Sequence, residues 1–387
     1  MEERIRLDEF SLTGGPLHRL GCRLGLVRAG TNTVALGLTL GWTAWIVLMA
    51  LVAMDGIGQH LFSLSLIGVH VRLLVVMPLF FLCESVLDPR MTVFVRTIVR
   101  SGVVPENALP ALESVIARIG RWRDFWLPEA IFLLVAVLLP LIGRQLPVSG
   151  TTALLDPNLA LVDLPLAGQW YWMVCLPLFR FLMLRWMWRL GLWCYFLWRV
   201  SRLPLHLVPT HPDYAAGLGY LEVVQTHFTP LVLAFSAVQS ASLAEDIYRG
   251  TVAFEVIYSV LALILVVDAV LFLGPLFIFS RKLWACRIKG LSDYSAFASS
   301  YVSDFDRKWL GEASPPEEEL LGTSDLQSLA DLGNSISIVR SMRWVPMSPS
   351  LLRDIVLAAL LPILPLLLLK YPVTELAEKF FTRLVGL

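Results

Sequence analysis

The sequence has few charged residues for its length, and those charges cancel. Only 16% of the 387 residues are Asp, Glu, Lys or Arg, 57% are hydrophobic, and the mean hydropathy is +0.70. Soluble domains carry roughly 25% charged residues, so this composition excludes an ordinary soluble protein. Thirty-one Lys and Arg balance thirty-one Asp and Glu, which leaves no net charge to attract nucleic acid. The composition predicts that the lipid bilayer is the main partner of the chain.

Cysteines are few, and the common catalytic motifs are lacking. Each of the five cysteines falls in an apolar run or in a segment that we assign to the cytoplasm: Cys22, Cys83, Cys175, Cys194 and Cys286. No structural disulfide is therefore expected. We find no metalloprotease histidine pair, no nucleophile elbow and no phosphate-cradling glycine loop, so we predict neither a cofactor nor a bound metal. No internal repeat is visible, which gives no support to an inverted-repeat transporter.

What the sequence does contain is a series of long apolar runs. A membrane helix needs about 20 mostly apolar residues, because the hydrocarbon core is about 30 Å thick and a helix rises about 1.5 Å per residue. Seven stretches meet this requirement: 34–53, 61–83, 125–142, 168–189, 219–243, 252–279 and 351–369. The first run follows more than thirty residues of mixed character and is as long as a full span, so we expect an anchor and not a cleaved signal peptide.

The positions of Lys and Arg predict the orientation of these spans. Short basic loops stay in the cytoplasm. With the N-terminus inside, 21 of the cations outside the spans fall on the cytoplasmic side, against five outside. The sequence therefore predicts an all-α membrane protein of about seven spans, with the N-terminus in, the C-terminus out, and amphipathic helices in the cytoplasm.

This topology divides the chain into seven segments. We expect a cytoplasmic N-terminal segment at 1–33, spans one and two at 34–83, a cytoplasmic helical segment at 84–124, and spans three to six at 125–280 with a cytoplasmic loop at 201–218. A second cytoplasmic helical segment at 281–350, span seven at 351–369 and an external amphipathic tail at 370–387 complete the chain.

The second cytoplasmic segment opens with an aromatic stripe. Five side chains share one face of a predicted helix: Tyr294, Phe297, Tyr301, Phe305 and Trp309. Such a face packs against another part of the same chain or docks a partner. Further on, Ser324 stands three residues before Gln327, a capping-box spacing that predicts the start of another helix. With the tryptophan-rich fourth span, the stripe favours a homo-oligomer.

Several charged side chains lie inside the predicted spans. Charges at membrane depth cost several kcal/mol, so they face a bundle interior or water. Besides His70, which stands close to Arg72 in span two, they comprise a set of nine, four arginines, four carboxylates and a second histidine: Arg72, Arg180, Arg185, Arg189, Glu129, Glu222, Glu255, Asp268 and His227. The equal numbers of arginines and carboxylates are compatible with ion pairs that fix the packing of the helices. By the predicted topology, six of the nine fall in the cytoplasmic half: Glu129, Arg185, Arg189, Glu222, His227 and Asp268.

The fifth span also carries uncharged polar side chains at helical spacing. The stripe consists of Glu222, Gln225, Thr226, Thr229, Ser236, Gln239 and Ser240. Spacings of three, four and seven residues place these side chains on one helix face. A face of this kind lines a water-filled pathway or forms a hydrogen-bonded helix interface. We predict an inward-facing vestibule lined by span five and the lower part of span four, through which an ion passes.

The loop before the fifth span is rich in proline, histidine and glycine. In RLPLHLVPTHPDYAAGLGYLE, His206, His211 and Asp213 are candidates for moving protons or binding a metal. The alternative is structural, with Thr210 or Asp213 capping the next helix. Gly217 and Gly219 would let another backbone or a ligand approach closely.

Two segments carry a family resemblance. PTHPDYAAGLGYLE and LLGTSDLQSLADLGNS, with the span pattern around them, resemble segments of a group of uncharacterised bacterial polytopic membrane proteins. The resemblance implies a location in the bacterial inner membrane. It implies no activity and no residue roles.

Three classes of function are compatible with these patterns. The first is an ion channel or transporter that uses the intramembrane charges. The second is a signalling or assembly protein that binds a partner through its cytoplasmic helices. The third is an enzyme that acts on a lipid at the cytoplasmic face, with the loop histidines, Asp213 and Glu222 as acid, base or metal ligands.

Overall fold

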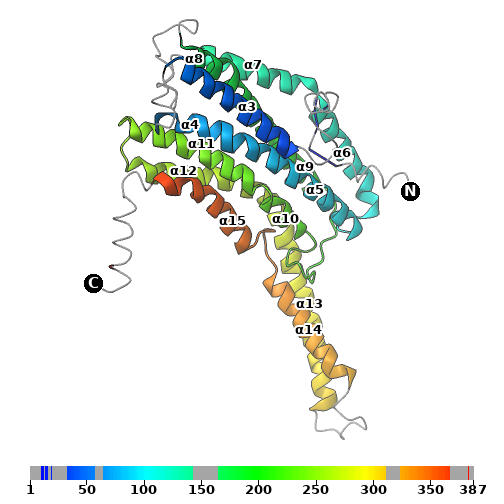
Figure 1. Ribbon diagram of the computed structural model, residues 1–387. Coiled ribbons are helices and arrows are strands. Elements are labelled where there is room, and N and C mark those ends of the chain that lie inside the picture. The colour runs from blue at the N-terminus through cyan, green and yellow to red at the C-terminus, as the bar shows by residue number, and fades with distance from the viewer. Residues whose placement is uncertain are drawn as a thin grey trace.

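A helical body and a projecting arm make up the computed structural model of the protein (Figure 1). The structure describes residues 10–12, 14–15, 19, 33–56, 64–142, 164–310, 323–366 and 382. All regular secondary structure in these residues is helical, which confirms the all-α prediction. The predicted tail at 370–387, apart from residue 382, most of the segment 1–33 and the acidic loop at 311–320 lie outside the described residues.

Five helical segments of the described chain are long and apolar enough to cross a bilayer. They run over Thr33–Met54, Ile67–Arg100, Tyr220–Tyr248, Val256–Trp309 and Pro349–Leu366. The protein is therefore a multi-pass membrane protein by composition and helix length. The exposed apolar side chains on the body, such as Trp42 and Ile46 of the first segment, are those expected where a helix faces lipid.

These segments consist of the following labelled helices. The first is α3 (Thr33–Met54), and the second joins α4 (Ile67–His70), the π-helix η3 (Val71–Val76) and α5 (Met77–Arg100). The third joins α10 (Tyr220–Thr226) and α11 (Thr229–Tyr248). The fourth joins α12 (Val256–Asp268), η8 (Ala269–Leu273), η9 (Gly274–Phe279) and α13 (Ser280–Trp309), and the fifth is α15 (Pro349–Leu360) with η10 (Leu361–Ile363).

The other two predicted spans are helical as well. The stretch 125–142 forms α7 (Trp126–Ile142), which has 17 residues. The stretch 168–189 lies in α8 (Leu166–Trp170), the π-helix η7 (Tyr171–Cys175) and α9 (Leu176–Ser201). The helix continues beyond the predicted stretch, to Ser201. The count of seven spans and their orientation stay predictions.

Three helices set the register of the body. Arg72 contacts Tyr171, Phe80 contacts Phe179, and Glu84 contacts Arg189, so α5 and α9 run in parallel. Gly68 contacts Glu245, and Phe80 contacts Phe235, so α11 runs antiparallel to α5. Each polar side chain in this core is therefore fixed at a definite depth relative to the others.

The second predicted span continues much further than its apolar run. Instead of ending at Cys83, the helix extends to Arg100 because its later turns bury Leu87, Met91, Phe94 and Ile98 on one face. After η4 (Glu106–Ala108), the segment α6 (Leu109–Asp124) forms a separate amphipathic helix that packs against α9. The predicted cytoplasmic segment 84–124 is helical, but its first part belongs to the same helix as span two.

The arm consists of α13 and α14 (Ser324–Ser341), which pack along each other away from the body (Figure 1). Most of the predicted aromatic stripe lies at the contact between the two helices. Tyr301 Oη donates a hydrogen bond to the Asp325 carbonyl at 3.1 Å, and Trp309 Nε1 donates to the Asp325 carboxylate at 3.2 Å. Phe297, however, is 60% exposed. The stripe is thus mainly an interface within the chain.

The predicted capping box at Ser324 is wrong in detail. The helix does begin there, but Thr323 occupies the N-cap position and Ser324 is already the first helical residue. The Gln327 side chain points onward and donates to Asp331 Oδ1 at 3.0 Å. The reciprocal bonds of a capping box are therefore not formed.

Candidate functional site

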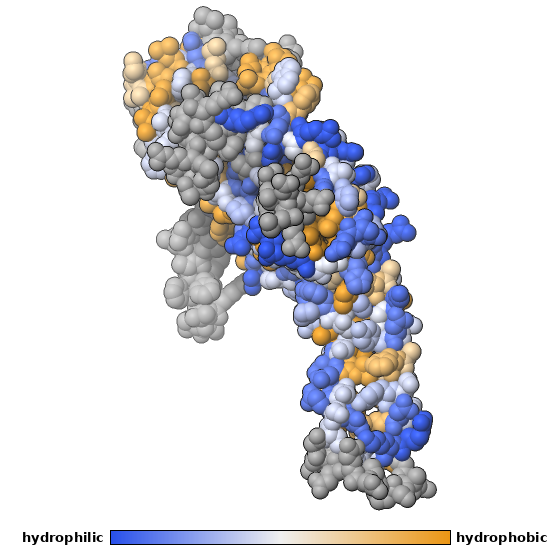
Figure 2. Space-filling view, turned by 90° about the vertical axis from the view of Figure 1, so that its right-hand side faces the viewer, coloured by the Kyte–Doolittle hydropathy of each residue, from blue (hydrophilic) through white to orange (hydrophobic). Residues whose placement is uncertain are grey.

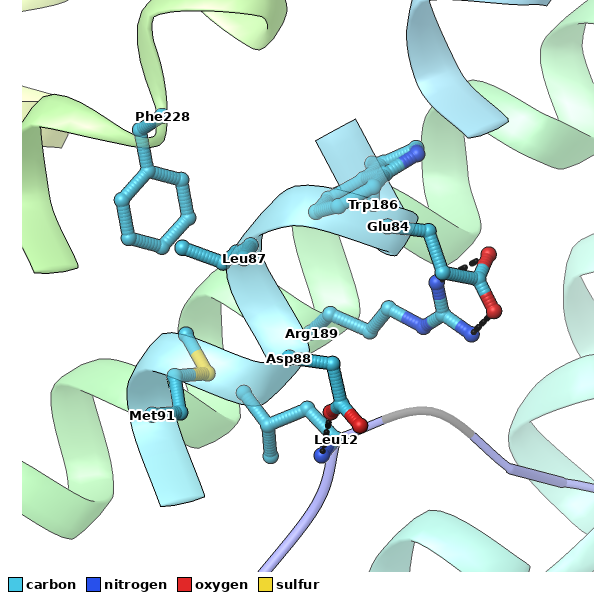
Figure 3. A pocket seen from close by; sticks show the side chains of 8 residues that line it. All are labelled: Leu12, Glu84, Leu87, Asp88, Met91, Trp186, Arg189 and Phe228. Carbon is cyan, nitrogen blue, oxygen red and sulfur yellow. Dashed lines mark hydrogen bonds and ion pairs between the residues drawn. The ribbon is translucent and has the colours of Figure 1, made fainter. Parts of the chain in front are cut away.

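A buried ion pair joins α5 to α9 near the middle of the body. Arg189 Nη1 lies 2.8 Å from Glu84 Oε2, and Arg189 Nη2 donates to Glu84 Oε1 at 3.0 Å (Figure 3). The two side chains are only 6% and 5% exposed. Two parallel N–H to oxygen bonds between a guanidinium and a carboxylate fix both the distance and the orientation of the pair. The pair therefore locks the two helices at one relative position.

Residues near the N-terminus close one side of this pair. Asp88, one turn after Glu84, accepts hydrogen bonds from the Ser11 hydroxyl at 2.7 Å and from the Leu12 backbone N–H at 2.8 Å. Arg185 Nη2 donates to the Gly14 carbonyl at 2.8 Å, and its Nε lies 3.5 Å from Glu129 of α7. We call these side chains, with Arg189, the Glu84 cluster: Glu84, Asp88, Glu129, Arg185 and Arg189.

The space inside the Glu84 cluster is small. A cavity of ≈ 10 Å³ is lined by Glu84, Asp88, Arg189, Phe228 and neighbouring apolar side chains (Figure 3). About 10–15 Å³ is the least that holds one water molecule. The Glu84 cluster is therefore closely packed, and its cavity has room for about one water molecule at most.

A second polar cluster lies nearer the other end of the same helices. Arg72 is 7% exposed, and its Nη1 donates to Tyr171 Oη at 2.8 Å, while its Nη2 donates to the Ser242 hydroxyl at 3.2 Å. Glu245 accepts a hydrogen bond from the Gly68 N–H at 2.7 Å. We call these five residues the Arg72 cluster. They come from α4, η3, η7 and α11. The continuous helical segments 67–100 and 166–201 thus contribute to both clusters, whereas α7 contributes only to the Glu84 cluster and α11 only to the Arg72 cluster.

A layer of aromatic rings separates the two clusters. The ring of Phe80 lies 6.3 Å from those of Phe179 and Phe235, and Phe235 lies 6.2 Å from Phe272. All four side chains are buried. Phe80 stands between Arg72 and Glu84 on one continuous helix, so this phenylalanine layer is an apolar partition between two charged regions.

Two of the predicted charged residues have an unpaired buried atom. In α9, Arg180 follows Phe179 of the phenylalanine layer, and its Nη1 is buried with no hydrogen-bond partner in the structure. In α12, both carboxylate oxygens of Asp268 are buried without a partner, and the residue is 2% exposed. The four arginines and four carboxylates expected in the spans therefore do not form four ion pairs.

Asp268 lies on a different side of the phenylalanine layer from the five other residues that were expected in the cytoplasmic half. Phe272 contacts Phe228 and Phe235 of α11, so Asp268, one turn earlier in an antiparallel helix, lies beyond the phenylalanine layer, on the side of the Arg72 cluster. The other five residues expected in one half do lie on the opposite side, toward the arm. The assignment of all six residues to the cytoplasmic half stays a prediction.

The polar stripe of the fifth span is largely engaged in helix contacts. Gln225 is fully buried and its Nε2 donates to the Phe272 carbonyl, while the Ser236 hydroxyl donates to the Ala359 carbonyl at 2.5 Å. Thr226, Thr229 and His227 bond to carbonyls of their own helical segment. Of the two alternatives left open for this stripe, the hydrogen-bonded helix interface is the one that these contacts favour.

The loop before α10 is organised by one aspartate. The Asp213 carboxylate accepts hydrogen bonds from the backbone N–H groups of Ala215, Gly217 and Gly219, at 2.7–3.2 Å, and lies 2.8 Å from His211 Nδ1. Asp213 thus shapes the loop and does not cap the helix itself, which starts at Tyr220. A Cβ on Gly219 would meet this carboxylate, and one on Gly217 would meet the Val103 side chain. Side chains therefore lie close to both glycines, and the approach of another backbone or a ligand stays a prediction.

The other groups near this loop are also engaged. The His206 backbone N–H donates to the Val103 carbonyl at 2.8 Å. Glu222 pairs with Arg343 at 2.7 Å and accepts a hydrogen bond from Ser348, which fastens α10 to the segment that follows the arm. Among the described residues, no group of three or more His, Cys, Asp or Glu side chains is placed to hold a metal ion. With Asp213 and Glu222 occupied, the lipid-enzyme hypothesis gains no support from the loop.

Sequence reasoning missed most of the partners in these clusters. Glu84 directly follows the apolar run 61–83, and helical spacing from Phe80 to Glu84 and Leu87 is the signal that would have placed it on the buried face. Glu245 and Arg343 lie just outside predicted spans, and no local pattern marks them. Their partners are more than a hundred residues away in the chain, so only the tertiary structure reveals the contacts.

Comparison with known proteins yields no relative. No protein-family model, no curated protein and no solved structure matches the chain. The family resemblance of the two segments above therefore stays a prediction, and the function must be argued from the geometry alone.

Proposed function

We propose that the protein is an ion channel or transporter of the bacterial inner membrane. The observation that carries the proposal is the phenylalanine layer between the two charged clusters. Apolar constrictions close ion pathways because water does not wet them, while charged groups on either side attract and hold the ion. Here the Glu84 cluster and the Arg72 cluster stand at two depths of one helix bundle, with four rings between them.

This pathway differs from the vestibule expected along the fifth span. Of the polar side chains of α11, only those of Ser242 and Glu245 belong to the two clusters. Helices α5 and α9 supply most of the charges in these clusters. Both flanking clusters are hydrogen-bonded and tightly packed, so the structure corresponds to a closed state. Opening requires the rings to separate, as hinge or shear motions of packed helices allow.

The unpaired arginine favours an anion as the conducted species. Arg180 lies at the depth of the phenylalanine layer, and its Nη1 has no partner. A positive charge that is not neutralised at a constriction lowers the energy of an anion there and raises that of a cation. Replacing this charge should therefore shift the ratio of anion to cation flux toward cations.

Removing a ring from the layer tests the proposal directly. In liposomes, Phe80→Ala should increase ion flux by tenfold or more, since a smaller side chain lets water enter the constriction. The matched control is Phe94→Ala, because Phe94 is equally buried in the same helix but contacts Trp193, outside the layer. Phe80→Leu serves as a milder variant in case the alanine form does not fold.

The outcomes separate channel activity from general damage. Equal leakage through the Phe80 and Phe94 variants would show that instability, not an opened constriction, causes the flux. Absence of flux of chloride, nitrate, sodium, potassium or protons in folded wild type and in folded Phe80→Leu, at all voltages and pH values, would refute the proposal. Arg180→Gln in the Phe80→Leu background then reports on ion selectivity.

A second function, assembly with another protein through the arm, is favoured by one observation. The arm is largely hydrophilic but carries exposed hydrophobic side chains part-way along it (Figure 2). Phe297 is 60% exposed and Val302 is 40% exposed, although both belong to a helix that projects from the body. Exposed apolar side chains mark an interaction site more often when they lie on a hydrophilic projection than when they face lipid.

Co-purification tests this second function. We expect a stoichiometric partner, or a second copy of the chain, that is lost with Phe297→Asp and retained with Ser299→Asp, since Ser299 is exposed on the same helix. Tyr301→Asp is unsuitable because Tyr301 bonds to α14. Full-length protein that stays monomeric, with no stoichiometric partner, would refute both the assembly function and the predicted homo-oligomer.

A further inference from the structure

Asp268 is the most isolated charged group in the body. It lies on the buried stripe of α12 with Ile257 and Ile264, and its residue exposure is 2%. Neither carboxylate oxygen has a hydrogen-bond partner. An ionised carboxylate without a partner in an apolar interior costs far more than the fold gains from a single contact, and such a group is neutralised instead.

Charged groups on the neighbouring elements are all directed elsewhere. Helices α11, η8 and α15 pack against α12 (Figure 1). On α11, one oxygen of Glu245 accepts from the Gly68 N–H and the other is buried without a partner. Asp246 and Tyr248 lie in the last turn of α11, and Arg249 directly follows it, at the end of α11 that is remote from Phe235. On α15, Arg353 is paired with Asp354 at 2.9 Å and is exposed. Segment η8 has no titratable residue, and Glu255 and Tyr258 stand at the far end of α12. No cation among these elements compensates Asp268.

Two further features distinguish the surroundings of Asp268. The helix changes to a π-helix directly after it, at Ala269–Leu273, and π-helical turns inside helices occur frequently at functional sites. On α11, the Ser240 hydroxyl is a second buried side-chain group without a partner, and it lies on the same side of the phenylalanine layer as Asp268. The side of the layer on which Asp268 lies therefore has both an irregular helical turn and a second unpaired polar side chain.

We propose that Asp268 is a proton-binding site at the interface of α12 with α11 and α15. A single carboxylate needs only one proton to become neutral. A metal cation would need about six oxygen ligands, which these side chains do not supply. The site is separate from the two charged clusters, and it exists whether or not the phenylalanine layer conducts ions.

Carbodiimide labelling of the full-length protein in liposomes tests the site. Dicyclohexylcarbodiimide enters apolar regions and reacts with protonated carboxyl groups. We expect an adduct on the peptide that contains Asp268, with a yield that falls as the pH rises and does not change when sodium is added. Asp268→Asn, which has the same shape, should lose the adduct. The matched control is Glu84, which is also buried but has both carboxylate oxygens bonded to Arg189, and it should react much less.

Infrared spectroscopy keeps the proposal testable if the reagent does not reach the site. The protonated acid gives a carbonyl band that shifts in heavy water and is missing in Asp268→Asn. A carboxylate band assigned to Asp268 at neutral pH would overturn the proposal. Protection of Asp268 from labelling by sodium at constant pH would also overturn it, since it would identify a cation site. If the Phe80 variants show no increase in ion flux, the labelling and infrared results expected for Asp268 stay the same.

Discussion

At the scale of residues, the buried Arg189–Glu84 pair stabilises the fold while it is intact and destabilises the fold when one partner is removed. Its two hydrogen bonds compensate for removing both side chains from water. If one partner is removed, the other remains charged and buried, and breaking such a pair costs about 3–5 kcal/mol. If both are replaced by apolar side chains of similar volume, the loss is often small or reversed.

We therefore expect Glu84→Gln and Arg189→Met to lower the free energy of unfolding by about 3 kcal/mol or more each. The double variant Glu84→Leu with Arg189→Met should lie much nearer to wild type. Thermal unfolding in detergent can be followed with a thiol-reactive dye, because the free Cys83 and Cys175 are buried until the bundle opens. Arg353→Met, which removes one partner of an exposed pair, is the control and should have little effect.

A second residue-scale prediction concerns pH. Hydrogen bonds from the Arg123 guanidinium, and more weakly from the Gly15 N–H, hold the pKa of the Asp124 carboxyl below its usual range. Because the pKa of the folded form is lowered, the stabilisation is complete above the unfolded value of about 3.9 and is lost as the pH falls through the lower, folded value.

Asp124 has 38% of its side chain exposed, so solvent screens the interaction and its size is below about 1 kcal/mol. Amide hydrogen exchange of the peptide that contains Gly15 should become faster on acidification into this pH window. In Asp124→Asn, exchange should already be fast at neutral pH and show no such transition. A wild-type exchange rate that is flat through the window, after correction for intrinsic pH dependence, would contradict the expectation.

At the scale of elements, helix existence was predictable and helix pairing was not. The run 34–53 forms α3 with nearly the expected bounds, because about twenty apolar residues in lipid have no alternative to a helix. The end of α5 was misjudged because its last four turns follow an amphipathic pattern instead of an apolar run. The contact of Glu84 with Arg189 joins residues 105 apart, and this depends on the register of two helices, which no local pattern encodes.

Close packing of α3 against η3 gives an element-scale prediction. A Cβ on Gly41 would lie 2.3 Å from the Leu73 carbonyl oxygen, whereas a Cβ on Gly191 of α9 would meet nothing within 4 Å. In a helix, alanine is favoured over glycine by up to about 1 kcal/mol, so Gly191→Ala should equal or exceed wild type in melting temperature. Gly41→Ala should melt at a lower temperature, because backbone atoms must move apart. Equal effects of the two changes would show that the α3 contact is loose.

At the scale of the whole molecule, the described chain places a largely hydrophilic arm at one end of a helical body (Figures 1 and 2). The end of the body nearest the arm also holds the Glu222–Arg343 pair and the Asp213 loop. The opposite end holds the turn between α11 and α12. We expect these two ends to lie on different sides of the membrane, because α11 connects them and is long enough to cross it.

The distribution of positive charge predicts which side is which. Several basic residues follow η9, including Arg281, Lys282, Arg287 and Lys289 on the first turns of α13. Basic segments next to spans stay in the cytoplasm. In a cysteine-free background, Ser299→Cys in the arm should react with a membrane-impermeant maleimide only after cells are permeabilised. Ala253→Cys, exposed in the turn between α11 and α12, should react in intact cells. The reverse pattern would place the arm outside, and with it the Glu84 cluster would face the exterior instead of the cytoplasm.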